Sequence, residues 1–426
     1  MSPSAPYPTQ IPVGELHCQR NSYATELTTT CLDCSEKPDK QGFYSVMLQD
    51  TVLFPEGGGQ PFDTGYIDDI RVYNVQRQKL QHVHFTKEPV PVGKSVMVKL
   101  DWERRWDHMQ QHSGQHLLSA VLEQEPYKVE TGSWNLGSDK SYIELLTKDD
   151  KSKVPTAEQL AKVERAVNRL IIEDRPVMVH TQANHEDVER PESLPADYVG
   201  GGTIRTIKIR DLDSNPCCGT HVARLGDLQC MKLLHTEKVR GGNTRLFFLF
   251  GQRVLNTLET SYKISCQLTA LLSGPQETFI ENVEKLQLSN RNNMKMAKRW
   301  MAETAGYIVE NITRDLETKS VTVFYRSDDT ADMEFLVTIA NVIKERKILE
   351  ERSNRAIVLA AGEKSTGGPL IVVGGNDAVV QQVSKVVSQT LADDGVKGGG
   401  RGRWQGKTKS WHAIESLKEK LEFIEL

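Results

Sequence analysis

Two short segments place the strongest restriction on how this chain can fold. The first is His112–His116, with the sequence HSGQH, and the second is Cys217–His221, with the sequence CCGTH. Each supplies two metal-binding side chains four positions apart, and imidazole nitrogen and thiolate sulfur are ligands that divalent zinc prefers. A fold that joins the two segments can hold one tetrahedral Zn²⁺ ion between His112, His116, Cys217 and His221. The sequence therefore predicts a zinc protein.

The first segment lies in a predicted helix that begins after Asp101, a residue type that favours helix N-caps. His112 and His116 are one turn apart on this helix, so both side chains can reach one ion. His108 lies one further turn toward the N-terminus and is either a third ligand, a donor to a ligand or, as we favour, a paired and partly exposed histidine. Taken alone, the spacing favours histidines that are hydrogen-bonded and structural. A metalloprotease site is excluded because Ser113, not Glu, follows the first histidine.

The second segment follows an alternating apolar strand, residues 204–209, and a polar turn, residues 211–216. This order places Cys217 and His221 in a loop at the end of a strand, where ligands are commonly presented. Adjacent side chains of an extended segment point to opposite sides, so we do not count Cys218 as a ligand. Two buried thiols are the alternative interpretation. The presence of both segments in one chain favours the metal.

These motifs resemble those of the editing domain of alanyl-tRNA synthetase and of its free-standing relatives, the AlaX alanyl-tRNA editing proteins. A third motif with the same resemblance lies upstream and consists of Thr51 and the glycine-rich segment 54–65. Three motifs in the expected order form a specific signal. The doublet Cys217-Cys218 resembles the long eukaryotic form of the family.

The glycine-rich segment has a physical interpretation of its own. Gly57, Gly58 and Gly59 allow a ligand to approach the backbone closely, and Gln60 and Thr51 are uncharged donors and acceptors beside them. The segment is not a P-loop, because no Lys-Ser/Thr pair follows the glycines. A tight turn between strands of a small barrel is also expected here. The resemblance implies that the loop lines the amino-acid pocket, with Thr51 and Gln60 reading the substrate.

Length and composition set the frame for these motifs. A chain of 426 residues is expected to form two or three domains, and its formal net charge of −4 gives no general signal for a nucleic-acid partner. Neither a signal peptide nor an apolar stretch of membrane-spanning length is evident. The seven cysteines, an odd number, indicate reduced thiols. We therefore expect a cytoplasmic protein.

A second group of possible ligands lies near the N-terminus and consists of His17, Cys18, Cys31 and Cys34. The Cys-x₂-Cys spacing is that of half a zinc knuckle. A single pair of this kind is a frequent coincidence, so we favour reduced structural cysteines over a second metal.

The pattern of apolar residues predicts a mixed α/β (α+β) fold. We expect a β-barrel-like domain with the glycine-rich motif over residues 1–99 and a zinc-binding editing domain over residues 100–250. An antiparallel helical hairpin is expected over residues 251–305, and a C-terminal α/β domain over residues 306–426. The last of these parts resembles the C-terminal domain shared by alanyl-tRNA synthetases and long AlaX proteins.

The C-terminal domain contains a glycine-rich basic segment, residues 398–409. Arg401 and Arg403 can contact phosphates, and the indole of Trp404 can stack on an unpaired base. We favour an RNA-contacting loop over a flexible basic linker.

The resemblance implies a trans-acting aminoacyl-tRNA deacylase. An aminoacyl-tRNA is an ester, and its hydrolysis requires a directed water and stabilisation of the developing oxyanion. The implied substrate is Ser-tRNA(Ala), with Gly-tRNA(Ala) left open. Four protein ligands are typical of a closed structural zinc, so a non-catalytic tRNA-binding protein is the alternative. The ligand number, the general base and the oligomeric state stay open.

Overall fold

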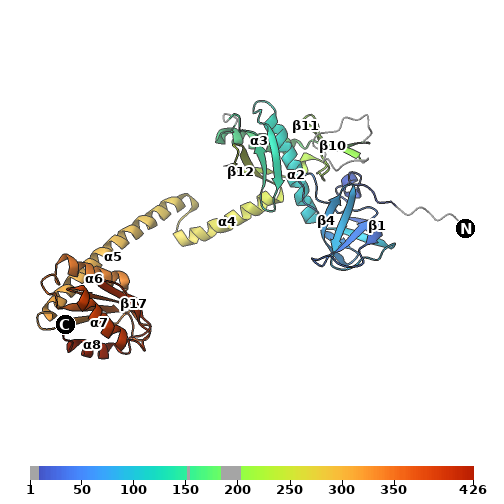
Figure 1. Ribbon diagram of the computed structural model, residues 1–426. Helices are drawn as coiled ribbons and strands as arrows, with labels where there is room; N and C mark the ends of the chain where they lie inside the picture. Colours follow the sequence, from blue (N-terminus) through green and yellow to red (C-terminus); the bar gives the residue numbers. More distant parts are fainter. Residues whose placement is uncertain (1–8, 151–153, 184–202) are drawn as a thin grey trace. The chain divides into compact units, whose positions relative to one another are not determined.

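The computed structural model describes residues 9–150, 154–183 and 203–426. The chain has the predicted mixed α/β class and divides into two compact units, Met1–Gln267 and Leu268–Leu426 (Figure 1). The division falls inside helix α4 (Gln252–Leu272). None of the helices within the described ranges is both long enough and apolar enough to cross a membrane.

A closed barrel of six antiparallel strands forms the first part of the first unit, and the predicted barrel is therefore confirmed. The strands follow each other around the barrel in the order β1-β2-β5-β4-β3-β6, and β6 pairs with β1 to close it. Alternating apolar side chains such as Val46, Leu48 and Val98 fill the interior. Closure leaves the sheet without an exposed edge. The strand bounds are β1 Glu26–Cys34, β2 Tyr44–Leu48, β3 Gly65–Ile67, β4 Ile70–Gln78, β5 Gln81–Thr86 and β6 Ser95–Leu100.

The N-terminal cysteines do not gather around a common point within the described residues. Cys18, in the short helix α1 (His17–Arg20), packs with Leu16 and Phe54, whereas Cys31 lies inside the barrel. Burial raises the pKa of Cys18 to about 12 and that of Cys31 to about 11, so both thiols stay protonated at neutral pH. Cys18 and Cys31 are therefore buried in two separate hydrophobic clusters.

The long helix α2 (Trp102–Glu123) follows the barrel directly and is the central element of the first unit. Its residues from His108 to Leu122 are buried between two small sheets and helix α3 (Ala157–Glu173). Asp101 occupies the N-cap position, but its carboxylate binds Arg71 and Thr64 instead of the first helical amides. One sheet has the order β12-β13-β8-β7 and the other the order β11-β10-β9. The strand bounds are β7 Thr131–Leu136, β8 Ser141–Leu145, β9 Val177–Ala183, β10 Thr203–Ile209, β11 Asp213–Pro216, β12 Met231–Lys238 and β13 Thr244–Phe250.

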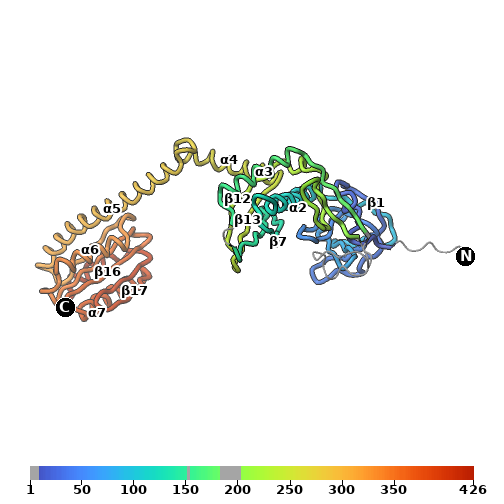
Figure 2. The backbone as a smooth tube through the Cα atoms, turned by 90° about the horizontal axis from the view of Figure 1, so that it is seen from above, coloured from blue at the N-terminus to red at the C-terminus, as the bar shows by residue number. Residues whose placement is uncertain are grey.

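The second unit contains a five-stranded sheet of order β14-β15-β16-β18-β17, which is visible in Figure 2 beside its helices. Strand β15 is buried along its whole length because both faces of the sheet are covered. Ile357 and Leu359 pack against α5 and α6, whereas Val358 and Ala360 pack against α7 and α8. The bounds are α5 Phe279–Asp315, α6 Met333–Glu345, α7 Asp377–Thr390, α8 Ile414–Glu422, β14 Val321–Arg326, β15 Ala356–Ala361, β16 Gly368–Gly374, β17 Lys397–Gly399 and β18 Arg403–Thr408.

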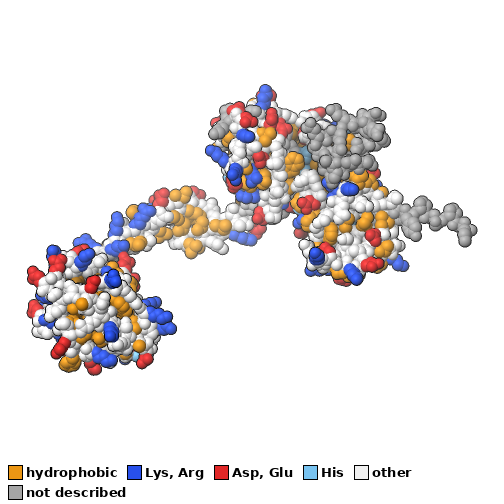
Figure 3. All heavy atoms as spheres, viewed as in Figure 1, with side chains coloured by type: hydrophobic (Ala, Val, Ile, Leu, Met, Phe, Trp, Pro, Cys, Tyr) orange, Lys and Arg blue, Asp and Glu red, His pale blue; other side chains and the backbone are white. Residues whose placement is uncertain are grey.

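Helices α4 and α5 are present where the sequence predicts two helices, joined through the short 3₁₀ helix η3 (Gln276–Thr278). The apolar stripes of both helices are exposed, and Figure 3 shows hydrophobic atoms along them. The antiparallel packing of the two stripes stays a prediction. The exposed apolar side chains are Leu255, Leu258, Tyr262, Ile264, Leu271, Ile280, Val283, Leu286 and Leu288.

The basic glycine-rich segment differs from the expected loop, because it forms the hairpin of β17 and β18. β18 also pairs with β16, which places Trp404 opposite Val372 in the sheet. The indole is only 7% exposed and lies against Gly398 and Gly406, where any Cβ would collide with it. The two glycines therefore make room for a core tryptophan, and its ring is not presented to solvent.

Candidate metal centre and its cavity

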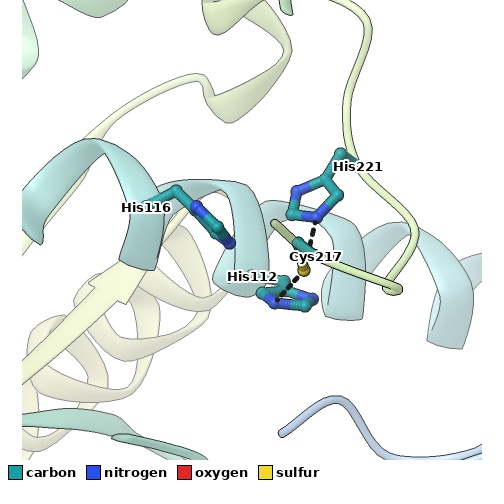
Figure 4. A group of neighbouring side chains, drawn as sticks. All are labelled: His112, His116, Cys217 and His221. Carbon is teal, nitrogen blue, oxygen red and sulfur yellow. Dashed lines mark hydrogen bonds between the residues drawn. The ribbon is translucent and has the colours of Figure 1, made fainter. Parts of the chain in front are cut away.

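The structure brings together the four side chains that the sequence singles out as metal ligands (Figure 4). Helix α2 presents His112 and His116, and the loop after β11 presents Cys217 and His221. The Sγ atom of Cys217 lies 3.4 Å from Nε2 of His112 and 3.3 Å from Nε2 of His221. One ligand atom from each of the four lies within 4.8 Å of all the others.

These separations fit a zinc ion. Zn–N bonds of about 2.0 Å and a Zn–S bond of about 2.3 Å at tetrahedral angles separate sulfur and nitrogen by roughly 3.5 Å. In addition, Nε2 of His116 is buried and has no hydrogen-bond partner within the described part of the chain. A bound cation would satisfy this nitrogen, and a set of three imidazoles and one thiolate suits zinc.

A polar atom lies beside Nδ1 of each histidine on the far side from the cluster. Oε1 of Gln60 is 3.0 Å from Nδ1 of His112, and Oγ of Ser113 is 3.0 Å from Nδ1 of His221. A carboxylate oxygen of Asp213 lies 3.8 Å from Nδ1 of His116. Such partners fix the tautomer and orientation of metal-binding imidazoles, so all three Nε2 atoms are directed inward.

The protonation states of the cluster also suit a metal. Burial alone would raise the pKa of Cys217, but the interactions with the His112 and His221 imidazoles outweigh burial and hold this pKa well below its ordinary value. Burial lowers the pKa of His221 to about 3. Burial also lowers the pKa of His116, yet the nearby Asp213 carboxylate and Cys217 sulfur outweigh burial and raise this pKa to about 9. A thiolate and a neutral imidazole are therefore ready for binding, whereas His116 would release a proton.

The turn between Cys217 and His221 is held in a fixed shape by its surroundings. Gly219 lies so close to the ring of His112 that a Cβ would be 2.3 Å from Cε1, so no other residue type fits. The guanidinium of Arg205 donates to the carbonyl oxygens of Cys217 and Gly219 at 3.2 and 2.9 Å. These two bonds, the Arg205 clamp, fix the position of Cys217 and His221 relative to α2.

Thr51 and Gln60, which we expected to read the substrate, do not line the cavity. Both are fully buried, and the Thr51 hydroxyl is 3.0 Å from Nε2 of His84 and also accepts from the Leu53 amide. Gln60 contacts His112 and both the amide and the hydroxyl of Thr220, at 2.9 and 2.8 Å. Paired backbone bonds between Gly57 and Gln60 turn the Gln60 side chain inward.

A cavity of about 380 Å³ opens beside the cluster and is reached by His116 and Cys217. Gly57 and Gly58 line it. Gly58 has a φ of +58° and faces the Cys218 thiol. Gly59 faces the Trp134 indole instead, and a Cβ there would be 2.4 Å from Nε1.

Sequence reasoning missed the buried ion pair of Arg105 and Asp63. Both side chains are fully buried, and Asp63 also accepts from the Phe54 amide at 2.7 Å, so the pair joins the glycine-rich segment to α2. Arg105 lies on the same face of the helix as His108 and His112. A charged residue on the face that carries the predicted ligands was the sequence feature that could have indicated a buried ion pair. His108 is buried, not partly exposed, and lies 4.0 Å from Asp63 outside the ligand group.

The remaining predicted site residues lie in the second unit. Arg401 is exposed between β17 and β18, whereas Arg403 is half-buried and Trp404 is buried within β18. Asp213, Ser113 and Gln115 were not predicted, since their roles depend on which segments meet in space.

Comparison with known families first defines the class of protein. Residues 204–247 match the family described as "Threonyl and Alanyl tRNA synthetase second additional domain". This match contains Cys217, His221 and the Arg205 clamp. The fold and the cluster therefore belong to a chain with a synthetase-type additional domain.

Similarity over nearly the whole chain then narrows the class. The chain is 40% identical over 404 residues to "Alanyl-tRNA editing protein Aarsd1-A" of Xenopus laevis, which covers 92% of this chain and 93% of the relative. It is 31% identical over 441 residues to "Putative alanyl-tRNA editing protein alaX" of Saccharomyces cerevisiae, covering 94% of each. It is 28% identical over 389 residues to "Alanine--tRNA ligase" of Thermococcus kodakarensis, covering 88% of this chain and 41% of the ligase. The chain belongs to the alanyl-tRNA editing protein family.

Proposed function

We propose that this protein is a trans-acting aminoacyl-tRNA deacylase that hydrolyses the ester of mischarged tRNA(Ala). Ser-tRNA(Ala) is the primary substrate and Gly-tRNA(Ala) a second one. Membership of the family and the names of the relatives support the class of reaction. The observation that carries the proposal is the convergence of His112, His116, Cys217 and His221 beside a cavity.

The same four side chains would hold one Zn²⁺ ion, which when bound polarises an ester carbonyl or a water molecule. Of the four, only His116 and Cys217 line the cavity, so the substrate approaches the cluster from their side. His112 and His221 lie behind them and are held by Gln60 and Ser113.

The residues of the glycine-rich segment have two different tasks in this proposal. Gly57 and Gly58 admit the substrate to the cavity, because the backbone there carries no side chain. Gln60 acts through His112 as a positioning residue, and Thr51 supports the start of the segment through its bond to Leu53.

The β17–β18 hairpin forms part of the proposed tRNA-binding surface. Lys397, Arg401, Lys407 and Lys409 are exposed on it and can neutralise phosphates. Trp404 keeps the hairpin in the sheet and does not stack on a base. The seven free cysteines fit a reducing compartment, and we place the protein in the cytoplasm.

One observation favours a second candidate function. Four protein ligands normally close a zinc site, which would suit a tRNA-binding protein with a structural metal. Purified protein should be presented with Ser-tRNA(Ala) and Ala-tRNA(Ala). We expect serine to be released and alanine to be retained. Serine release no faster than in buffer would remove the enzyme and leave the binding protein.

A further inference from the structure

Trp134 is an exposed aromatic side chain that lines the cavity without belonging to the metal cluster. Its side chain is 38% exposed, so the indole is not simply part of the hydrophobic core. It lies on β7, at one edge of its sheet, where the register with β8 shifts between Thr131 and Trp134. In a regular strand, residues three apart face opposite sides, yet these two both line the cavity. The irregularity therefore directs the indole toward the cavity, as strand bulges beside binding sites often do.

The glycine-rich segment holds this indole close to the metal cluster. A Cβ on Gly59 would be 2.4 Å from Nε1 of Trp134 and 3.1 Å from Cδ1, so the ring edge lies against bare backbone. The preceding residue, Gly58, lies against the Cys218 thiol, where a Cβ would be 2.8 Å from Sγ. Because consecutive Cα atoms are about 3.8 Å apart, the indole lies within roughly 12 Å of that thiol. Cys218 directly follows the candidate ligand Cys217, so a single ligand can reach both the ring and the cluster.

The cavity has room for more than an esterified amino acid. Its volume of about 380 Å³ is that of a pocket for a whole small molecule, for which about 300–1,000 Å³ is typical. The guanidinium of Arg77, from β4, lines the same cavity as the indole. A nucleotide offers a flat base and an anionic phosphate, and proteins bind unpaired nucleotides with aromatic rings and nearby cations. The cavity therefore has the chemistry of a nucleotide site next to a metal cluster.

We infer that Trp134 stacks on the unpaired adenine at the 3′ end of the aminoacyl-tRNA. This inference rests on the proposed function and concerns how the ester is positioned. The amino acid is esterified to the ribose of this same nucleotide, so a base held by the indole keeps the ester within reach of His116 and Cys217. Stacking tolerates any base, so Trp134 contributes affinity and position and does not identify the tRNA. Gly59 serves the same task, because it leaves space for the ring.

The test uses two non-hydrolysable seryl amides that differ only in the base. One is the 3′-seryl amide of 3′-amino-3′-deoxyadenosine, and the other is the same amide on a ribose without a base. By calorimetry, we expect the full-length protein to bind the adenosine compound about 10- to 100-fold more tightly. Trp134→Leu should remove that preference by weakening only the adenosine compound. Trp134→Phe should keep part of the preference, because a smaller ring can still stack.

Trp300→Leu is the matched control, because this tryptophan is 63% exposed on α5 and does not line the cavity. It should keep the full preference for the adenosine compound, and all variants should keep the zinc content and the unfolding midpoint of the wild type. Equal weakening of both amides by Trp134→Leu, an unchanged preference in this variant, or no preference in the wild type would each overturn the inference. The proposed function fails on a different result, which is the absence of serine release from Ser-tRNA(Ala) by the wild type.

Discussion

At the scale of single residues, the most informative contact is the one between Gln60 and His112. It joins the glycine-rich segment to the cluster over 52 positions and determines which nitrogen of His112 faces the other ligands. Gln60 therefore affects the metal without touching it.

Replacing Gln60 with Leu should lower zinc affinity about 10- to 100-fold, because His112 loses the partner that orients it. Gln60→Glu keeps an oxygen at the same place and should retain most of the affinity. Competition with a chromogenic chelator measures both. Equal affinity of Gln60→Leu and wild type would contradict the role given to this side chain.

His84 leads to a second prediction at the scale of residues, which concerns how the free energy of unfolding depends on pH. Burial in the barrel lowers its pKa from 6.5 to about 4. The folded state thus holds a neutral imidazole, and its contribution is complete above pH 6.5 and is lost as the pH falls toward 4. Between pH 7.5 and 5.5 this costs about 1 kcal/mol of the free energy of unfolding of the first unit.

His84→Gln should remove that part of the pH dependence of the free energy of unfolding. His235 is exposed, so the control variant His235→Gln should leave the pH dependence unchanged. Urea unfolding at both pH values, followed by hydrogen exchange in peptides from the barrel, gives the comparison. Identical pH dependence in wild type and His84→Gln would show that this histidine contributes nothing.

At the scale of elements, periodicity predicted the barrel and the α2 helix, and the ligand spacing indicated which α2 side chains can meet. Alternation in segments such as residues 44–48 and the four-residue spacing of His112 and His116 are local properties of the chain. The inward turn of Gln60 and the burial of Trp404 depend on pairings between distant segments, so local patterns could not reveal them. Gly398 and Gly406 belong to the segment that was expected to form an RNA-contacting loop, but they make space for the Trp404 indole.

The β17–β18 hairpin separates a structural residue from the proposed RNA contacts. Trp404→Ala should lower the free energy of unfolding of the second unit by about 3–5 kcal/mol, because it empties a filled core site. Lys407→Ala should leave stability within about 0.5 kcal/mol and should weaken tRNA binding. The slope of the logarithm of the tRNA-binding constant against the logarithm of salt concentration should also become shallower by about one unit. A stable Trp404→Ala protein with weakened tRNA binding would restore the stacking interpretation.

At the scale of the whole molecule, each unit carries one part of the proposed activity. The first unit holds the cluster and the cavity, and the second presents the basic hairpin. The matches to the family relatives cover 92% and 94% of the chain and therefore extend over both units. The proposed activity depends most on a zinc ion held by the four converging side chains.

The most direct test measures zinc content and serine release from Ser-tRNA(Ala) on the same preparations of wild type and His116→Ala. The wild type should contain one zinc per chain and release serine, and His116→Ala should lose both, with circular dichroism showing that the fold is retained. Full turnover by His116→Ala, or by wild-type protein stripped of metal, would contradict the account.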